Sequence, residues 1–166
     1  MGAVRTREEV AQLYHRHGDT VYQICLMLLK QVPDAEDAAQ TVFRKVMEYE
    51  KPFRDPEHEK AWFIVTARNE CKNQLKHWWR SRRVEPGILE QLSCGPPGEE
   101  GEDLRKLIWE LPENYRMTLY LYYYQGYSTQ EVGELLGQKP ATIRAWLSRS
   151  RKKLKLRLEE EEYGTP

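Results

Sequence analysis

Apolar side chains in the first third of the chain recur at steps of three and four residues, which is the period of an amphipathic α-helix. The pattern predicts a helix over residues 7–17 and, after Gly18, a strongly apolar helix over residues 20–31. Pro33 ends this second helix and begins a third, in which Asp34 is expected to cap free backbone N–H groups.

A loop is predicted over residues 52–56, because prolines stand at both of its ends. The helix that follows, over residues 57–80, carries apolar positions at helical spacing. Its predicted buried stripe consists of Ala61, Ile64, Arg68, Cys71, Leu75 and Trp78.

The helical period is lost in the next segment, which is rich in Gly and Pro and has six acids between Glu85 and Asp103. We therefore predict a flexible acidic linker over residues 84–102. It joins a first helical domain over residues 7–83 to a second over residues 103–160.

Four helices are predicted in the second domain, over residues 103–111, 112–125, 129–136 and 140–160. Gly126 ends the second helix, and Ser128 and Glu131 have the spacing of a capping box at the start of the third. A short turn that contains Gly137 leads to Pro140, which suits the first position of a helix. A short turn between two helices, of which the second is basic, is typical of a helix-turn-helix motif. The sequence thus predicts an all-α protein of two small helical domains.

In this motif, apolar residues of the third helix are expected to face Ile143 and Leu147 of the fourth. The other side of the fourth helix is then free to enter a DNA major groove, where arginine bonds to guanine and other cations reach phosphates. The residues predicted to contact DNA are Thr142, Arg144, Ser148, Arg149, Arg151 and Lys152, with Trp146 on the same exposed faces. A helical bundle with a basic, solvated end is the alternative.

Charge supports two nucleic-acid contacts, although the 26 basic and 26 acidic residues of the 166-residue chain cancel. Basic residues concentrate at 68–83 and 139–157, and acids concentrate between them. Two basic faces separated by an acidic segment suggest a polyanion bound at two places, whereas the alternative is two solvated helix faces.

Several classes of protein are excluded by what the sequence lacks. It has no apolar run of 18 residues, so no membrane insertion is expected. Its three cysteines and four histidines do not have the spacing of a disulfide framework or a metal site. It has neither a Gly-rich phosphate loop nor a recognisable catalytic constellation. We expect a cytoplasmic, non-enzymatic protein without metal or cofactor.

Two further polar surfaces are predicted in the first domain. Acids and neighbouring polar residues in the helix after Pro33 form a face suited to a basic helical partner, or serve only as helix caps. In the long helix, tryptophans beside basic residues suit single-stranded DNA, because bases stack on aromatic rings. The alternative is that these rings belong to the core, which we favour for Trp78.

Three segments carry a family resemblance. Residues 34–43 resemble the DAED-x-x-Q-x-x-F pattern of the polymerase-binding helix in the extracytoplasmic-function branch of the sigma-70 family. Residues 62–69, followed by Lys72 and Asn73, resemble that family's W-L-x-x-I-A-x-N pattern for the promoter −10 element. Residues 111–151 resemble its region 4, ending in a run similar to L-x-R-A-R.

The resemblance implies a role for each surface. The first domain corresponds to region 2, and its polar face would bind the β′ clamp helices of core RNA polymerase rather than serve as caps alone. The residues implied there are Asp34, Glu36, Asp37, Gln40 and Arg44. The residues implied at the −10 element are Trp62, Asn69, Lys72, Asn73 and Lys76, with the 52–56 loop in the position that captures a flipped base.

The resemblance places the DNA-contacting residues of the last helix at the −35 element and implies contacts with the polymerase β flap and an anti-sigma factor. Two departures, Ala145-Trp146 and Lys139-Pro140-Ala141, leave the −35 sequence preference open. Two alternative functions also stay open: a helix-turn-helix regulator that binds duplex DNA without polymerase, and a helical interaction protein that binds no DNA.

Overall fold

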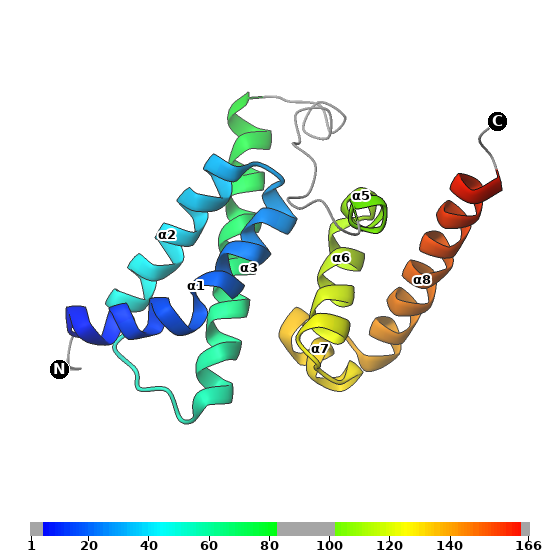
Figure 1. The fold of residues 1–166 in the computed structure, drawn as a ribbon. Coiled ribbons are helices and arrows are strands. Elements are labelled where there is room, and N and C mark those ends of the chain that lie inside the picture. Colours follow the sequence, from blue (N-terminus) through cyan, green and yellow to red (C-terminus); the bar gives the residue numbers. More distant parts are fainter. Residues whose placement is uncertain (1–4, 83–101, 164–166) are drawn as a thin grey trace. The chain divides into compact units, whose positions relative to one another are not determined.

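The computed structural model describes residues 5–82 and 102–163, with side chains described over 5–78 and 106–155. The described residues form helices and no strand, which confirms the all-α prediction (Figure 1). The chain divides into two compact units, residues 1–94 and 95–166. The predicted linker lies outside the described residues except for Glu102, and its boundaries stay a prediction.

Unit 1 consists of the helices α1 (Arg7–Leu29), α2 (Val32–Glu48) and α3 (Pro56–Arg82), each of which packs against the other two. Its core is formed by fully buried side chains, among which Ile24, Val42 and Phe63 come from the three different helices. Burying such a side chain contributes about 1.5–3 kcal/mol, so contact among the three helices holds the unit together.

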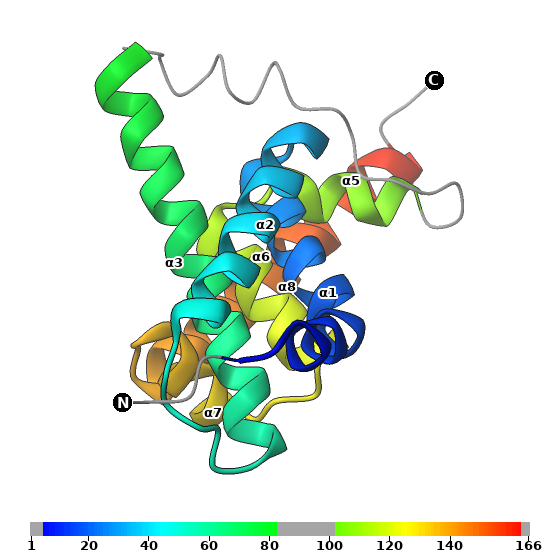
Figure 2. The same ribbon diagram turned by 90° about the vertical axis from the view of Figure 1, so that its left-hand side faces the viewer.

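The predicted break at Gly18 was wrong, because α1 is one continuous helix through that residue. Packing against α2 and α3 along its length outweighs the low helix propensity of a single glycine. Figures 1 and 2 show that the axis of α1 bends part-way along its length. The helix begins after Thr6, whose side chain accepts a bond from the Glu9 N–H, and ends before Lys30.

The prediction that Asp34 caps α2 was also wrong. The helix begins at Val32, with Gln31 in the capping position and Pro33 in the first turn. Because proline fixes φ at a helical value and needs no N–H partner there, the helix starts ahead of Asp34. Asp34 lies in the first turn, where its negative charge suits the positive end of the helix dipole.

The buried side of α3 differs in part from the predicted stripe. Ile64 and Cys71 are fully buried as predicted, but Phe63 and Ala67 complete the buried side, and Arg68 is only half-buried. Ala61, Leu75 and Trp78 are half-buried as well. The helix packs against both α1 and α2, so its buried side is wider than a single line of three- and four-residue steps.

Unit 2 consists of α5 (Glu102–Glu110), α6 (Glu113–Leu119), a π-helical turn η1 (Tyr120–Tyr124), α7 (Thr129–Leu136) and α8 (Pro140–Tyr163). The predicted helix 112–125 corresponds to α6 together with η1, and Gly126 ends it with a φ of 77°. Helix α8 contacts α5, α6 and α7. None of the helices in the described parts of the chain is long and apolar enough to cross a membrane.

Candidate nucleic-acid interface

The start of α7 is fixed by the predicted capping box. The Ser128 hydroxyl accepts a bond of 3.1 Å from the Glu131 N–H, and the Glu131 carboxylate accepts one of 3.0 Å from the Ser128 N–H. The hydrogen bond from the Ser128 backbone, followed by the one with its side chain, holds the pKa of Glu131 below its ordinary value. The two reciprocal bonds satisfy backbone donors that the first helical turn leaves free.

The turn between α7 and α8 depends on close approach of two backbones at Gly133. A Cβ atom on Gly133 would lie 2.5 Å from the Gln138 carbonyl oxygen, a distance that real Cβ atoms essentially never show. The Gln138 N–H also donates a bond of 2.8 Å to the Gly133 carbonyl. Gly137, with a φ of 69°, reverses the chain between them. Sequence reasoning missed Gly133, although a glycine in the middle of a helix is a signal of close packing.

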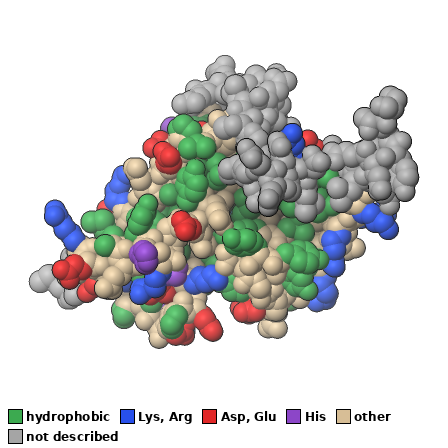
Figure 3. Space-filling model, in the orientation of Figure 1, with side chains coloured by type: hydrophobic (Ala, Val, Ile, Leu, Met, Phe, Trp, Pro, Cys, Tyr) green, Lys and Arg blue, Asp and Glu red, His purple; other side chains and the backbone are tan. Residues whose placement is uncertain are grey.

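Helix α8 presents a polar side opposite its buried side. Ile143, Leu147 and Ser150, at helical spacing, are at most 1% exposed. The exposed residues of the predicted DNA-contacting set are Arg144, Ser148, Arg149, Arg151 and Lys152, whereas Thr142 is half-buried. Figure 3 shows Lys and Arg side chains gathered over α8. Such a helix side can lie in a major groove and place its Lys and Arg side chains beside DNA phosphates.

Trp146 is half-buried, so its predicted exposure was wrong. Its ring centroid lies 6.4 Å from that of Tyr115 in α6, and the Lys153 ammonium lies 5.3 Å from the Tyr115 ring centroid. The large apolar indole therefore packs in the contact between α8 and α6. Arg151 donates a bond of 3.2 Å from Nε to the Leu147 carbonyl of its own helix, which holds the base of that side chain along α8.

Sequence reasoning missed the role of Arg116, which lies in α6, the helix that packs against α8. It is only 5% exposed, and its Nη1 donates bonds of 2.9 Å to the carbonyls of Trp109 and Leu111. These carbonyls belong to the end of α5 and the residue after it, so Arg116 ties the end of one helix to the next. A charged hydrogen bond to a helix-end carbonyl is stronger than a neutral one.

The polar face of α2 in unit 1 is exposed along most of its length. Ala35, Ala38, Val42 and Val46 point into the core. Of the predicted partner-binding residues, Glu36, Asp37, Gln40 and Arg44 are exposed and Asp34 is half-buried. The structure therefore brings the five residues onto the side of one helix that unit 1 leaves open.

The predicted −10 residues lie along one strip of α3. Trp62, Asn69, Asn73 and Lys76 follow one another at steps that keep them on the same side of a helix. Asn69, Asn73 and Lys76 are exposed, and Lys72 beside them is half-buried. Amides, cations and an aromatic ring are the groups that bind unstacked bases and their backbone.

Trp62 belongs to an aromatic cluster at the start of the strip. Its ring centroid lies 5.0 Å from that of Tyr49 and 5.8 Å from that of Phe53, both in the loop between α2 and α3, and 5.1 Å from that of Phe63. Phe63 is fully buried, as the core alternative predicted. Trp62 itself is half-buried, so it is fixed by its neighbours while part of its ring faces solvent.

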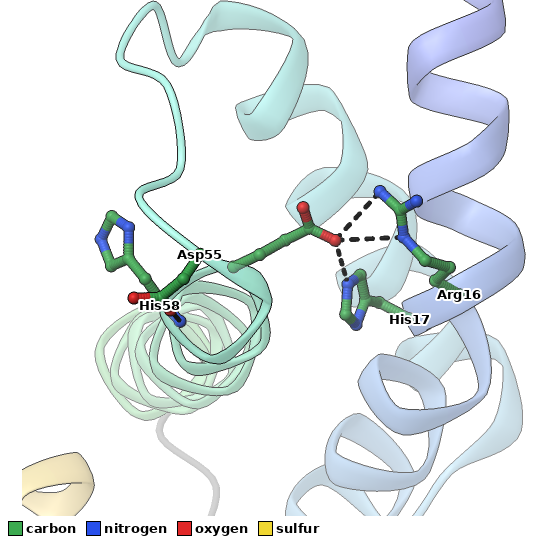
Figure 4. A network of polar contacts seen from close by, with 5 residues as sticks. Arg16, His17, Asp55 and His58 are labelled. Carbon is green, nitrogen blue, oxygen red and sulfur yellow. Dashed lines mark hydrogen bonds and ion pairs between the residues drawn. The ribbon is translucent and has the colours of Figure 1, made fainter.

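The beginning of α3 is anchored to α1 by a carboxylate. Glu59 Oε1 lies 2.7 Å from His17 Nε2 and 3.0 Å from Arg16 Nη2, and Figure 4 shows Arg16 and His17 directed toward it from α1. Asp55, drawn in the same view, accepts a bond of 2.7 Å from the His58 N–H at the first turn of α3. These contacts fix the first turn of α3, where the loop ends and the strip of predicted −10 residues begins.

Two family models match the chain, one in each unit. The model for sigma-70 region 2 matches residues 13–81, and the model for sigma-70 region 4 matches residues 101–154. The chain belongs to the sigma-70 family. All the residues predicted to bind polymerase or DNA fall within these two matched regions.

Individual relatives agree with this assignment. RNA polymerase sigma factor SigV of Bacillus subtilis is 24% identical over 149 residues, which is 89% of this chain and 90% of the relative. ECF RNA polymerase sigma factor SigM of the same organism is 26% identical over 152 residues, 88% and 93% of the two chains. The sigma factor RpoE of Bartonella quintana, solved in complex with the anti-sigma factor NepR, shares the fold with a TM-score of 0.75 at 21% identity, covering 90% of this chain and 96% of that one.

Proposed function

We propose that this RNA polymerase sigma factor divides promoter recognition between its two helical units. The polar face of α2 binds core polymerase at the β′ clamp helices, the strip on α3 and the loop before it hold the unstacked −10 strand, and α8 grips the −35 duplex. Sigma factors are in general non-enzymatic initiation factors, and we propose that this one too acts by binding alone. The energy for strand separation then comes from stacking and phosphate contacts.

The observation that carries the proposal is the exposure of three polar surfaces inside the two matched regions. The α2 face, the α3 strip and the α8 side each lie opposite the buried side of their helix. A duplex-DNA regulator that works without polymerase needs only α8, and would have no use for the other two surfaces.

The first test is co-purification with core RNA polymerase, comparing the wild type with Asp37→Lys. Asp37 is exposed, so reversing its charge alters the surface while leaving the core of unit 1 intact. Asp19→Lys is the matched control, because Asp19 is also exposed and lies on α1 outside the proposed face. We expect Asp37→Lys to weaken core binding about tenfold and Asp19→Lys to leave it unchanged. Absence of binding by the wild type would reject the polymerase role and favour the duplex-DNA regulator.

We also propose that an anti-sigma factor holds the protein inactive by covering the polymerase-binding face. The related RpoE was crystallised with such a partner, NepR. Exposed apolar side chains near the α2 face suit a protein partner, since Val32 is 41% and Met47 46% exposed. Competition between core polymerase and a candidate anti-sigma factor for the wild type tests this proposal, and simultaneous binding of both would contradict it.

A further inference from the structure

Arg5 contacts the loop between α2 and α3 from more than forty residues away in the sequence. Its Nη1 donates bonds to the carbonyls of Val46, at 3.2 Å, and Tyr49, and its Nη2 donates one of 2.8 Å to the carbonyl of Lys51. Val46 lies in the last turn of α2, and Tyr49 is the residue directly after that helix. The guanidinium therefore bonds carbonyls at the end of α2 and just after it, of which that of Val46 also accepts a bond of 3.3 Å from the Tyr49 N–H, and places a positive charge at the negative end of the helix dipole.

The same guanidinium lies against the two aromatic side chains of this loop. Its central carbon is 4.9 Å from the ring centroid of Phe53 and 5.5 Å from that of Tyr49, within the range of cation–π attraction. Both rings pack on Trp62. Arg5 is thus connected through these two rings to Trp62, the first residue of the strip on α3. It lies outside the segment matched by the region 2 model.

The second half of the loop has its own anchors. The Arg54 N–H donates a bond of 3.1 Å to His58 Nδ1, and Asp55 caps the first turn of α3. No comparable bond from α3 holds the loop residues 49–51 within the described part of the chain, so the carbonyls there depend on Arg5. Removing Arg5 takes away the side-chain bonds at the α2 end of the loop and leaves there the bond from the Tyr49 N–H to the Val46 carbonyl and the packing of Tyr49 on Trp62.

We propose that Arg5 is a positioning residue for −10 recognition: it fixes the loop 49–55, and through Tyr49 and Phe53 the ring of Trp62, in the arrangement that receives the unstacked strand. This inference rests on the proposed function of the α3 strip. Arg5 itself touches no DNA in this proposal, because its guanidinium is occupied by three carbonyls and two rings.

The first part of the test follows the loop in the full chain without DNA. We expect Arg5→Ala to speed amide hydrogen exchange over residues 49–55, and trypsin cleavage after the exposed Arg54, about tenfold. Arg5→Lys keeps the charge but not the planar fork, so it should restore only part of the protection. Arg7→Ala is the matched control, because this substitution removes the same charge. Arg7 is exposed and makes no such contact within the described residues.

The second part measures binding of the reconstituted holoenzyme to a fluorescent single-stranded −10 oligonucleotide. We expect Arg5→Ala to weaken this binding about three- to tenfold, with core binding and −35 duplex binding unchanged, and Arg7→Ala to behave as the wild type. Unchanged loop exchange in Arg5→Ala overturns the proposal, and so does faster exchange with unchanged strand binding. If the wild-type holoenzyme binds no strand, the −10 assignment itself falls and the positioning role falls with it, while the exchange result separates that failure from an error about Arg5.

Discussion

Replacing Gly133 with alanine tests whether backbone contact fixes the turn of the helix-turn-helix. In the middle of an exposed helix this change is worth about 1 kcal/mol of stabilisation, because alanine has the better helix propensity. Here the added Cβ would lie 2.5 Å from the Gln138 carbonyl oxygen and 3.5 Å from the Pro140 nitrogen. Both neighbours are backbone atoms, so no side-chain rotation relieves the clash.

Relief requires the turn to move away from α7. Overpacking of this kind costs about 1–3 kcal/mol. The shift also loosens the 2.8 Å bond from the Gln138 N–H to the Gly133 carbonyl, which is worth about 1 kcal/mol. After the propensity gain is set against these costs, the balance is a destabilisation of about 1–3 kcal/mol. Because α8 begins at Pro140, the displacement also changes how the proposed DNA-binding helix is presented.

The measurement is native-state hydrogen exchange in the full chain, resolved by segment, together with fluorescence anisotropy on a −35 duplex. We expect amides of α7 and the start of α8 to exchange about 5- to 100-fold faster, and duplex affinity to fall by more than the loss of folded protein explains. Gly18→Ala is the matched control, since its Cβ would lie 3.6 Å from the Tyr14 ring, an ordinary contact, and α1 should exchange more slowly. Slower exchange of α7 in Gly133→Ala, as in the control, would refute the reasoning.

Three further predictions concern unit 2. The pKa of Glu131 is lowered in the folded protein, so its contribution to α7 stability is complete above the ordinary carboxyl pKa and is lost as pH falls through the lowered value. Protection factors of amides at the start of α7, which correct for the slower intrinsic exchange in acid, should fall over that range, and less steeply in Ser128→Ala, which itself costs about 1 kcal/mol. Arg116→Met removes a buried charge that bonds two carbonyls, and should destabilise unit 2 by about 2–3 kcal/mol in denaturant unfolding, whereas an unchanged midpoint would show that those bonds contribute nothing. Arg144→Ala and Arg149→Ala should each weaken −35 duplex binding. A variant that removes a phosphate contact lowers the slope of log affinity against log salt concentration by about 1, whereas one that removes a base contact alters the sequence preference instead. Unchanged duplex affinity in both variants would favour the interaction protein that binds no DNA.

The features that the sequence predicted well are those set by neighbouring residues. The capping box of Ser128 and Glu131 and the bounds of α7 follow from contacts three residues apart, and both agree with the structure. The exposed polar sides of α2 and α8 follow from helical spacing once the buried residues are known. Such local signals are the same in the isolated segment and in the folded unit, so no tertiary structure is needed to interpret them.

Two of the errors, at Gly18 and Trp146, arose where a distant element decides the outcome. Gly18 weakens an isolated helix by about 1 kcal/mol, but α1 is stabilised by packing against α2 and α3. Trp146 is exposed on a helical wheel, yet Tyr115 of another helix lies beside it. In both cases the packing partner, and not the residue or its neighbours, determines the local structure.

Arg5 extends this argument from structure to function. Nothing near it in sequence indicates a role, because its partners lie in the loop after α2 and are brought to it only when α1 packs against that helix. Recognition motifs name the side chains that would touch DNA, but the distance from Trp62 to Tyr49 and Phe53 exists only while the loop is held in place. The groups that hold a binding surface in shape need not carry any motif, so the surface and its support have to be located by different means: the first by residue pattern, the second by tracing which carbonyls and rings have their partner far along the chain.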